Sequence, residues 1–223
     1  KMLTTTSITK TGFEPLQGTD AVSEVKGRMQ KMGVKRLPVV DPTTQKLIGQ
    51  LSADRLPDGE SDAVVADLEL DEAVKIYEGQ HIFEAVRLML QYELQFLPLV
   101  DDEWTFLGMI SKQQVLQALS RMLNLAEEGS VVTVELEPID FSISELVQIV
   151  ETEGAKILGL TVETPDSTQQ TFHVSLKLNM KDISRVTAAL KRYDYDVIVE
   201  SENTVFGKDL EHRADELLKY IDM

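Results

Sequence analysis

Short apolar runs closed by polar turns recur along the first half of the chain. The stretch RLPVVDPTTQKLIGQLS, from Arg36 to Ser52, has a near copy in FLPLVDDEWTFLGMIS, from Phe96 to Ser111. When the copies are aligned on Pro38 and Pro98, their apolar, turn and glycine positions coincide after one deletion in the turn. A shared spacing of about sixty residues with matching residue types indicates a duplicated supersecondary unit.

Each copy predicts the same order of helix, strand, turn, strand and helix start. The helices are predicted from apolar residues at helical spacing, namely Val22, Val25, Met29 and Met32 in the first copy and Ile82, Ala85, Val86, Met89 and Leu90 in the second. LPVV and LPLV predict strands that end in turns at Asp41 and Asp101. The second strands, KLIGQL and TFLGMI, carry an interior glycine, which lets another backbone or a ligand come close. One such unit is too small to bury its own core, so we expect the two copies to pack together.

The pattern changes after NLAEEGS, residues 124–130, which we interpret as a linker. Four strands are predicted from VVTVELE, KILGLTVET, TFHVSLKLN and DVIVES. The helices between them are marked by Ile143, Leu146, Val147 and Val150 and by Ile183, Val186 and Leu190. The order βαββαβ predicts a four-stranded antiparallel sheet with both helices on one face, the ferredoxin-like plan. Residues 202–223 carry an apolar stripe from Leu210 to Ile221 and predict a short amphipathic helix, docked on the protein or on a second copy.

The duplicated stretches resemble the two halves of a cystathionine-β-synthase (CBS) domain pair, the Bateman module, over roughly Leu3 to Leu123. On this resemblance residues 1–60 are CBS repeat 1 and residues 61–123 are CBS repeat 2. The stretches EPIDFSISELVQIVETEGAKILGLTVE and VSLKLNMKDISRVTAALKRYDYDVIVES resemble an ACT domain over residues 131–201. The predicted fold class is therefore α+β, with tandem CBS repeats, a ferredoxin-like ACT-like domain and a short C-terminal helix.

The CBS resemblance implies a regulatory sensor that binds an adenosine-containing ligand between its repeats. It implies that the proline-bearing strand forms a wall for adenine, that the following helix start binds phosphate, and that a carboxylate three residues beyond the serine binds ribose. The implied nucleotide-binding residues are Lys35, Arg36, Leu37, Pro38, Val39, Ser52 and Arg55 in the first repeat, and Leu97, Pro98, Leu99, Ser111 and Gln114 in the second. AMP, ADP, ATP and S-adenosylmethionine are the candidate effectors, and no cofactor is required.

Both repeats depart from the family pattern at the ribose-binding position. Arg55 stands three residues after Ser52, and Gln114 stands three residues after Ser111. Asp54 comes one position early, and on an α-helix that offset turns a side chain by about 100°, so we expect it to be a poor substitute. We expect Arg55 to meet a phosphate instead, together with Lys35 and Arg36.

The same residues also have explanations that need no ligand. Ser111 and Gln114 form the pattern of a capping box, as do Ser142 and Glu145, and Ser52 is a good helix N-cap. The alternative function is therefore a ligand-free module that builds a homodimer. In the ACT-like domain the turn at residues 138–142 lacks the glycine that amino-acid-binding members often have, so sheet or edge pairing between two chains is the alternative there.

Charge and composition limit the classes of molecule that the protein can bind. The chain of 223 residues has 22 Lys and Arg against 38 Asp and Glu, which gives a formal net charge of −16. This charge argues against nucleic acid and anionic membranes as partners. The absence of cysteine excludes disulfides and thiolate catalysis and suits a cytoplasmic location. No apolar run approaches the roughly 18 residues of a membrane helix, and Lys1 is not expected to be the natural start.

Catalytic and metal-binding patterns are absent from the sequence. His81, His173 and His212 are scattered, without metal-ligand spacing or a neighbouring nucleophile in a known motif. The acidic run from Asp101 to Glu103 falls in the repeated turn, which favours turn chemistry over Mg²⁺. We therefore predict a non-catalytic regulatory protein, a homodimer that responds to a nucleotide and passes the signal through the ACT-like domain to a protein partner not yet identified.

Overall fold

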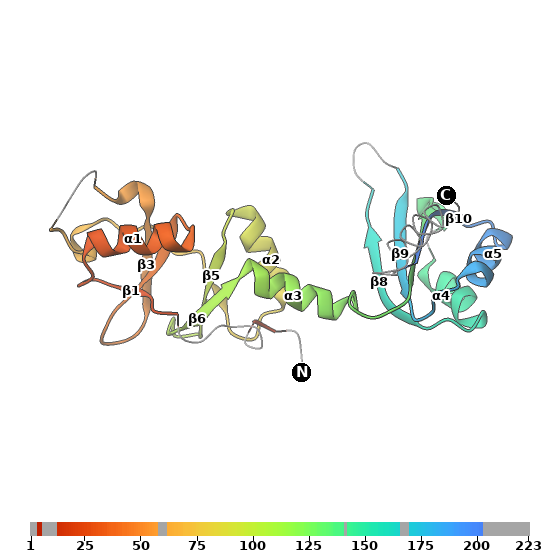
Figure 1. Cartoon of the computed structure of the whole chain (residues 1–223), viewed down its shortest axis with the longest axis horizontal. Coiled ribbons are helices and arrows are strands. Elements are labelled where there is room, and N and C mark those ends of the chain that lie inside the picture. The colour runs from red at the N-terminus through yellow and green to blue at the C-terminus, as the bar shows by residue number, and fades with distance from the viewer. Residues whose placement is uncertain (1–3, 6–12, 58–61, 141, 166–169, 203–223) are drawn as a thin grey trace, which may run out of the picture. The chain divides into compact units, whose positions relative to one another are not determined.

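The computed structural model describes residues 4–5, 13–57, 62–140, 142–165 and 170–202. The chain divides into two compact units, Lys1–Leu119 and Ser120–Met223 (Figure 1). The predicted tail helix lies outside the described residues, except for Glu202 at the end of the last strand. None of the helices in the described parts has the length and apolar character that crossing a membrane requires.

Unit 1 contains the two repeats, and each is built around a small three-stranded sheet. The elements of the first repeat are β1 Leu16–Gln17, α1 Val22–Met32, β2 Arg36–Val40, β3 Leu47–Ser52 and a 3-10 helix Ala53–Arg55. The elements of the second are a 3-10 helix Val65–Asp67, β4 Ile76–Tyr77, α2 Ile82–Gln91, β5 Phe96–Val100, β6 Phe106–Ser111 and α3 Lys112–Met122. The strand orders are β1-β2-β3 and β4-β5-β6, with a parallel first pair and an antiparallel second pair in each. The duplicated unit that the sequence predicts is thus confirmed.

The helices of the repeats bury most of the predicted apolar positions, whereas Met32 and Val86 are only half-buried. In α1 the side chains of Val22, Val25 and Met29 are buried, and in α2 those of Ile82, Ala85 and Met89. Leu90, which we placed on the same stripe, is 69% exposed. It follows Met89 by one residue near the end of α2, and one step around a helix is about 100°, enough to turn it off the core face.

The two repeats end differently. After β6 the predicted capping box forms, because the Gln114 amide donates to the Ser111 hydroxyl at 3.2 Å and the Ser111 amide donates to the Gln114 side-chain oxygen at 2.9 Å. After β3 the prediction of an N-capped helix at Ser52 is wrong: only the three-residue 3-10 helix forms, without a side-chain cap. Pro57 explains the difference, because a proline disfavours helical backbone at the residue before it, and Leu56 is extended.

Backbone hydrogen bonds join the two repeats. The amide of Leu47 donates to the carbonyl of Trp104, and the amide of Phe106 donates to the carbonyl of Gln45, each at 2.9 Å. A small apolar cluster of Leu47, Ala73 and Val100 also contains side chains from both repeats. The expectation that the copies pack together is therefore confirmed.

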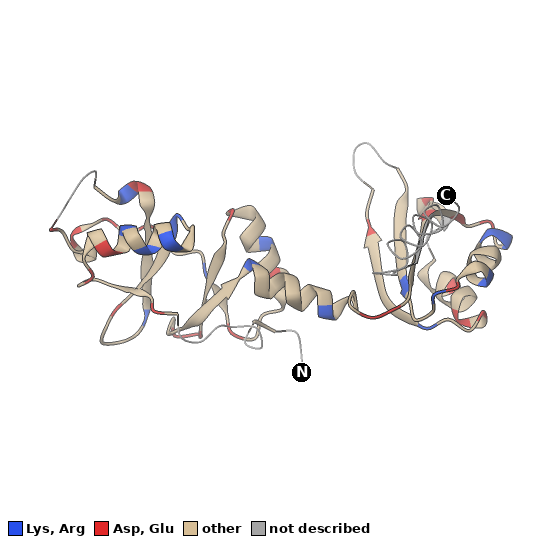
Figure 2. Ribbon diagram, viewed as in Figure 1, with Lys and Arg blue, Asp and Glu red and all other residues tan. Residues whose placement is uncertain are grey.

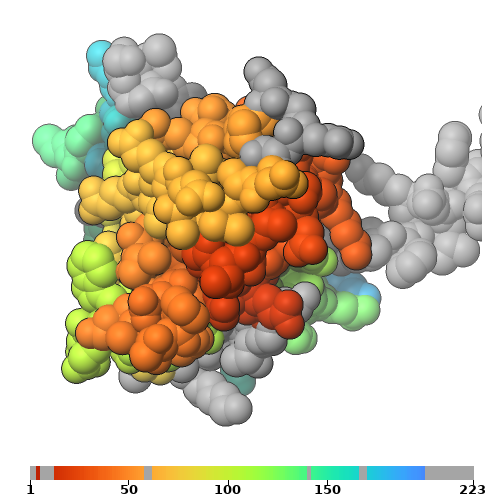
Figure 3. Space-filling model, turned by 90° about the vertical axis from the view of Figure 1, so that its left-hand side faces the viewer, coloured from red at the N-terminus to blue at the C-terminus, as the bar shows by residue number. Residues whose placement is uncertain are grey.

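The core of repeat 1 takes residues from beyond position 60. Val65 is buried in it beside Leu16, and Leu68 and Leu70 pack against it. The amide of Val22 donates to the Ala63 carbonyl, which ties this returning segment to the start of α1. In Figure 3 the segment is yellow-orange and covers part of the red and orange surface of repeat 1.

Unit 2 has the predicted ferredoxin-like plan. Its elements are β7 Ser130–Leu136, α4 Ile143–Thr152, β8 Ile157–Glu163, β9 Phe172–Leu178, α5 Ser184–Arg192 and β10 Asp196–Glu202. The sheet order is β10-β7-β9-β8 with every neighbouring pair antiparallel. One core cluster joins the sheet to α4 and α5, and it includes Leu146, Val150, Val186 and Leu190 at predicted positions. β7 begins at Ser130, the last residue of the predicted linker.

Two local expectations in unit 2 are corrected. The capping box at Ser142 does not form: its side chain makes no cap, and its hydroxyl lies 3.3 Å from that of Ser144. Strand alternation places Lys177 on the face opposite Leu176 and Leu178, where an exposed side chain is expected, yet it is only 6% exposed. The carbonyl of Leu123 lies over the neighbouring position, since a Cβ built on Gly159 would come within 3.1 Å of it, and Gly159 pairs with Lys177 across the ladder.

Candidate nucleotide-binding cleft

Pro38 and Pro98 lie in the middle strands of the two small sheets at positions that tolerate proline. Proline has no N–H and is therefore confined to edges and irregular positions of sheets. The two-residue strand β1 pairs only with Val39 and Val40, so β2 has a free edge beside Pro38. In the same way β4 pairs only with Leu99 and Val100. Both prolines are buried, at the place where the surfaces of the two repeats face each other.

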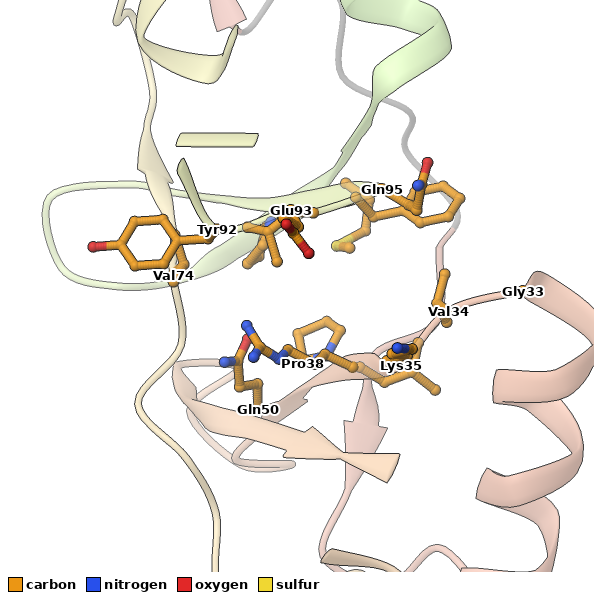
Figure 4. A pocket seen from close by; sticks show the side chains of 15 residues that line it. Gly33, Val34, Lys35, Pro38, Gln50, Val74, Tyr92, Glu93 and Gln95 are labelled. Carbon is orange, nitrogen blue, oxygen red and sulfur yellow. The ribbon is translucent and has the colours of Figure 1, made fainter. Parts of the chain in front are cut away.

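A cavity of about 320 Å³ lies at this surface, and we name it the inter-repeat cavity. The residues that line it are Gly33, Val34, Lys35, Arg36, Leu37, Pro38 and Gln50 from the first repeat and Val74, Tyr92, Glu93, Leu94, Gln95, Phe96, Pro98 and Met109 from the second. Figure 4 shows the labelled side chains of the first repeat along one wall and those of the second along the other. Its volume lies within the range of about 300–1,000 Å³ that is usual for small-molecule sites.

Equivalent positions of the two repeats line this cavity, but their chemistry differs. Lys35 and Arg36 on the first wall correspond to Gln95 and Phe96 on the second. Gly33 ends α1 in the left-handed conformation, with φ at 63°, and so directs the chain into β2. One wall is therefore cationic, whereas the facing wall is neutral to apolar apart from Glu93.

A second cavity of about 630 Å³ adjoins the first, and we name it the Asp71 cavity. Its lining residues are Arg36, Gln50, Ser52, Asp54, Asp71, Glu72, Ala73, Val74, Lys75, Tyr77, Leu88 and Tyr92. Arg36, Gln50, Val74 and Tyr92 line both cavities, so the two are neighbours, and we refer to them together as the cleft. Lys75 also places its ammonium group 4.0 Å from the centre of the Trp104 ring, in a cation–π contact.

Asp71 is held by both its backbone and its side chain. Its amide and carbonyl pair with those of Gln50, each hydrogen bond being 2.9 Å long. One carboxylate oxygen accepts a hydrogen bond from the Ser52 hydroxyl, and the other from Arg55 at 3.0 Å. The Ser52 hydroxyl, then the Arg55 guanidinium and the nearby Arg36, hold the pKa of the Asp71 carboxyl below its ordinary value.

Gly49 makes this approach possible. A Cβ built on Gly49 would lie 3.0 Å from the Asp71 carbonyl oxygen and 3.0 Å from the Leu70 Cβ. The prediction that the interior glycine of this strand lets another backbone come close is confirmed, and the approaching chain is the start of repeat 2.

The expectations for Arg55 and Asp54 are corrected. Arg55 lines neither cavity, because its guanidinium bonds to Glu69 at 2.9 Å and to Asp71 at 3.0 Å. Asp54 does line the Asp71 cavity, although we expected a helical offset to turn it away. That expectation assumed an α-helix, and the short 3-10 helix replaces it.

The remaining candidate residues fall into two groups. Leu37, Pro38 and Pro98 line the inter-repeat cavity, whereas Val39, Leu97 and Leu99 are almost fully buried in the strands and line neither cavity. Ser111 and Gln114 are occupied by the capping box and line neither cavity.

Sequence reasoning missed the cleft residues that come from outside the strand motif. Asp71, Val74 and Lys75 precede β4, and Tyr92 closes α2. The stretch DLELDEAVKIY, which resembles the opening of a CBS repeat, was the available signal, because the opening of one repeat can lie against the strands of the other.

The histidines and acidic turns take structural roles where they are described. The side chain of His81 caps α2 by accepting a hydrogen bond from the Phe83 amide, and His173 lies 3.6 Å from Glu163 on β8. One carboxylate oxygen of Asp101 accepts hydrogen bonds from the amides of Glu103 and Thr105 at 3.0 and 2.7 Å, which confirms turn chemistry. His212 lies outside the described residues, and within them no group of His, Cys, Asp and Glu has the geometry of a metal site.

Unit 2 has an acidic cavity of about 700 Å³ beside the turn at residues 138–142. The charged side chains described in its lining are Glu135, Glu137, Glu145, Asp194 and Asp196. These carboxylates would attract the ammonium group of a free amino acid, but the described lining holds no Lys or Arg to bind its carboxylate.

The chain is similar in sequence and in structure to known proteins. A family model described as CBS domain matches residues 65–121. A comparison with curated proteins found no match. Among solved structures, the chain is similar to a CBS domain pair/ACT domain protein from Thermotoga maritima, with 24% identity and a TM-score of 0.47 over 54% of this chain and 98% of that chain. It is also similar to the CBS domains of a transcriptional regulator from Streptococcus pneumoniae, with 18% identity and a TM-score of 0.45 over 52% and 99% of the two chains.

A third similar structure is that of CBSX2 from Arabidopsis thaliana in complex with AMP, with 20% identity and a TM-score of 0.41 over 54% of this chain and 93% of that chain. The family match confirms the CBS prediction for the second repeat, and the first repeat has the same strand order and register. The chain therefore contains a CBS domain, paired with a second copy of its strands and followed by a ferredoxin-like domain.

Proposed function

We propose that the protein is a non-catalytic regulatory sensor that binds an adenosine-containing ligand in the cleft of unit 1. The observation that carries this proposal is the contrast between the two walls of the inter-repeat cavity. Lys35 and Arg36 supply positive charge on one wall, and Phe96 and Pro98 supply an apolar surface on the other. An aromatic ring joined to an anionic group satisfies both walls at once.

The cleft joins residues of both repeats, so a ligand there would favour one arrangement of the repeats over others. A ligand shifts such an equilibrium only by its difference in affinity for the two arrangements. Regulation of a protein partner through the ferredoxin-like unit follows from this role and forms part of the proposal. For that unit we propose an ACT-like role in assembly or relay, and its acidic cavity favours this role over the binding of a free amino acid.

A thermal-shift screen with AMP, ADP, ATP and S-adenosylmethionine tests ligand binding. A ligand at about 100 times its Kd adds roughly 2.7 kcal/mol to the free energy of unfolding, which raises the midpoint by several degrees. The Lys35→Gln/Arg36→Gln double variant should lose most of this rise. If none of the four compounds moves the wild-type midpoint, the sensor proposal fails.

A matched control distinguishes the loss of cations in the cleft from an equal change in the net charge of the protein. Lys26 and Lys31 lie on α1, where the ribbon is blue at Lys and Arg in Figure 2, and they line neither cavity. The Lys26→Gln/Lys31→Gln double variant changes the net charge equally and should keep the full ligand response. Equal losses in both double variants would count against binding in the inter-repeat cavity.

A ligand-free homodimer is the second candidate function, and exposed apolar side chains favour it. Phe83 and Leu90, seven residues apart on one face of α2, are 55% and 69% exposed, and Leu116 on α3 is 66% exposed. Light scattering coupled to gel filtration should then give twice the monomer mass, and the Phe83→Ser/Leu90→Ser double variant should give the monomer mass. A wild-type monomer at micromolar concentration would exclude this candidate.

A further inference from the structure

The carboxylate of Asp71 is held in place by contacts to its backbone and to both of its oxygens. Its backbone is paired with Gln50 on both sides, and its two oxygens are held by different donors, Ser52 and Arg55. Arg55 is itself held by Glu69, which does not line the Asp71 cavity. Such an arrangement orients a side chain before any ligand arrives, so little ordering entropy is lost on binding.

The carboxylate retains capacity to accept further hydrogen bonds. Each carboxylate oxygen has two lone pairs, and each Asp71 oxygen uses one of them in the contacts above. The side chain is 29% exposed, and the residue lines the Asp71 cavity. Two neighbouring oxygens with one free lone pair each match two neighbouring hydroxyl donors.

The charges around Asp71 select against a polyanion. Arg36 and Lys75 are the cations described in the lining of the Asp71 cavity, against the carboxylates of Asp54, Asp71 and Glu72. This part of the cleft therefore suits an uncharged group that donates hydrogen bonds. The adjoining wall of Lys35 and Arg36 suits a single anionic group.

We propose that Asp71 binds the vicinal hydroxyl groups of the ligand, and that the ligand is a ribonucleoside with at most one phosphate group. Asp71 thereby supplies the carboxylate that repeat 1 lacks three residues after Ser52, and Arg55, which stands there, positions it. This inference rests on the proposed function, because it names the ligand class and the recognition residue of the same cleft.

Asp54 is the competing carboxylate in the same cavity. It is exposed and makes no hydrogen bond to the described residues, so its side chain would have to be ordered on binding. It lies one residue from Arg55 on the same 3-10 helix, which makes its variant a close control for the change in charge.

Isothermal titration calorimetry with AMP and 2′-deoxyadenosine monophosphate tests the inference. Wild-type protein should bind AMP about tenfold or more tightly than the deoxy compound, because the missing hydroxyl leaves a desolvated acceptor unpaired. In Asp71→Asn the ratio of the two Kd values should fall towards one, whereas Asp54→Asn should keep the wild-type ratio. The wild-type ratio needs no variant, so the inference stays testable even if Asp71→Asn does not fold.

The outcomes separate this inference from the function on which it rests. If wild-type protein binds AMP and the deoxy compound equally, the role of Asp71 is refuted and the sensor function stands. A wild-type ratio retained in Asp71→Asn, or lost in Asp54→Asn, refutes it as well. Absence of binding by any adenosine ligand refutes both.

Discussion

The backbones of Gln50 and Asp71 are joined by a reciprocal pair of hydrogen bonds, each 2.9 Å long. Gln50 lies in β3 of the first repeat, and Asp71 precedes β4 of the second. This pair brings the start of repeat 2 against the strand that opens the cleft. The packing of unit 1 and the proposed ligand recognition therefore depend on the same short segment.

The stability of unit 1 should depend on the ionisation of Asp71. The pKa of Asp71 is lowered in the folded protein from its ordinary value of 3.8, first by the Ser52 hydroxyl and then by Arg55. A lowered folded-state pKa means that the stabilisation is present above about pH 4 and is lost as the pH falls through the lowered pKa. We expect Asp71→Asn to lower the Tm between pH 5 and pH 8 and the difference from wild type to narrow below pH 4, as measured by circular dichroism.

Asp54→Asn is the control for this pH series, since Asp54 makes no hydrogen bond within the described residues. It should follow the wild-type curve. A difference between Asp71→Asn and wild type that stays constant down to pH 2 would show that the carboxylate charge of Asp71 does not stabilise the fold.

Substitution of Gly49 should be costly, and that of Gly27 favourable. A Cβ at position 49 would meet Asp71 and Leu70 at 3.0 Å, so Gly49→Ala should destabilise the protein by about 1–3 kcal/mol. Gly27 lies exposed within α1, where a Cβ meets nothing within 4 Å, so Gly27→Ala should stabilise it by about 0.5–1 kcal/mol. Urea unfolding measures both, and equal effects would argue against the close approach at Gly49.

Removal of the buried amine in unit 2 should stabilise that unit. The Lys177 amino group is buried and has no hydrogen-bond partner among the residues that the structure describes. Lys177→Met keeps the length of the side chain and removes an unsatisfied polar group, so we expect a gain of about 1–2 kcal/mol in the free energy of unfolding. The exposed Lys156 is the control, and Lys156→Met should change this free energy by less than about 0.5 kcal/mol.

The acidic half of the cleft should make ATP a weaker ligand than AMP. Asp54, Asp71 and Glu72 face the space beside the cationic wall, and additional phosphates would meet these carboxylates. We expect AMP to raise the Tm more than ATP at equal concentration, with a smaller difference at 0.5 M salt because exposed charges are screened. A larger response to ATP at low salt would contradict this account of the charges.

The two longer strands of each repeat and the strands of unit 2 could be predicted from the sequence because alternation and repetition are local signals. The different structures that follow β3 and β6 could not be predicted. Ser52 and Ser111 occupy equivalent positions, yet Ser111 caps α3 and Ser52 binds Asp71. The nearby Pro57 gave a local hint that the helix fails, but the partner that replaces the cap lies nineteen residues away.

The candidate site also contains residues that could be predicted from the sequence and residues that could not. Pro38 and Pro98 could be placed at the cleft from the motif, whereas Asp71 and Tyr92 could not, because they reach it through tertiary packing. The partners of Arg55 could not be predicted, because nothing in the sequence pointed to Glu69 and Asp71.

The placement of Val65 in the first core has a consequence for synthesis of the chain. Repeat 1 buries Val65 beside Leu16 and pairs β3 with Asp71, so a nascent chain that ends at residue 60 lacks both. Domains generally begin to fold from the N-terminus while the ribosome is still translating. We therefore expect the first repeat to complete its core only after the segment that contains Val65 and Asp71 has left the ribosomal tunnel.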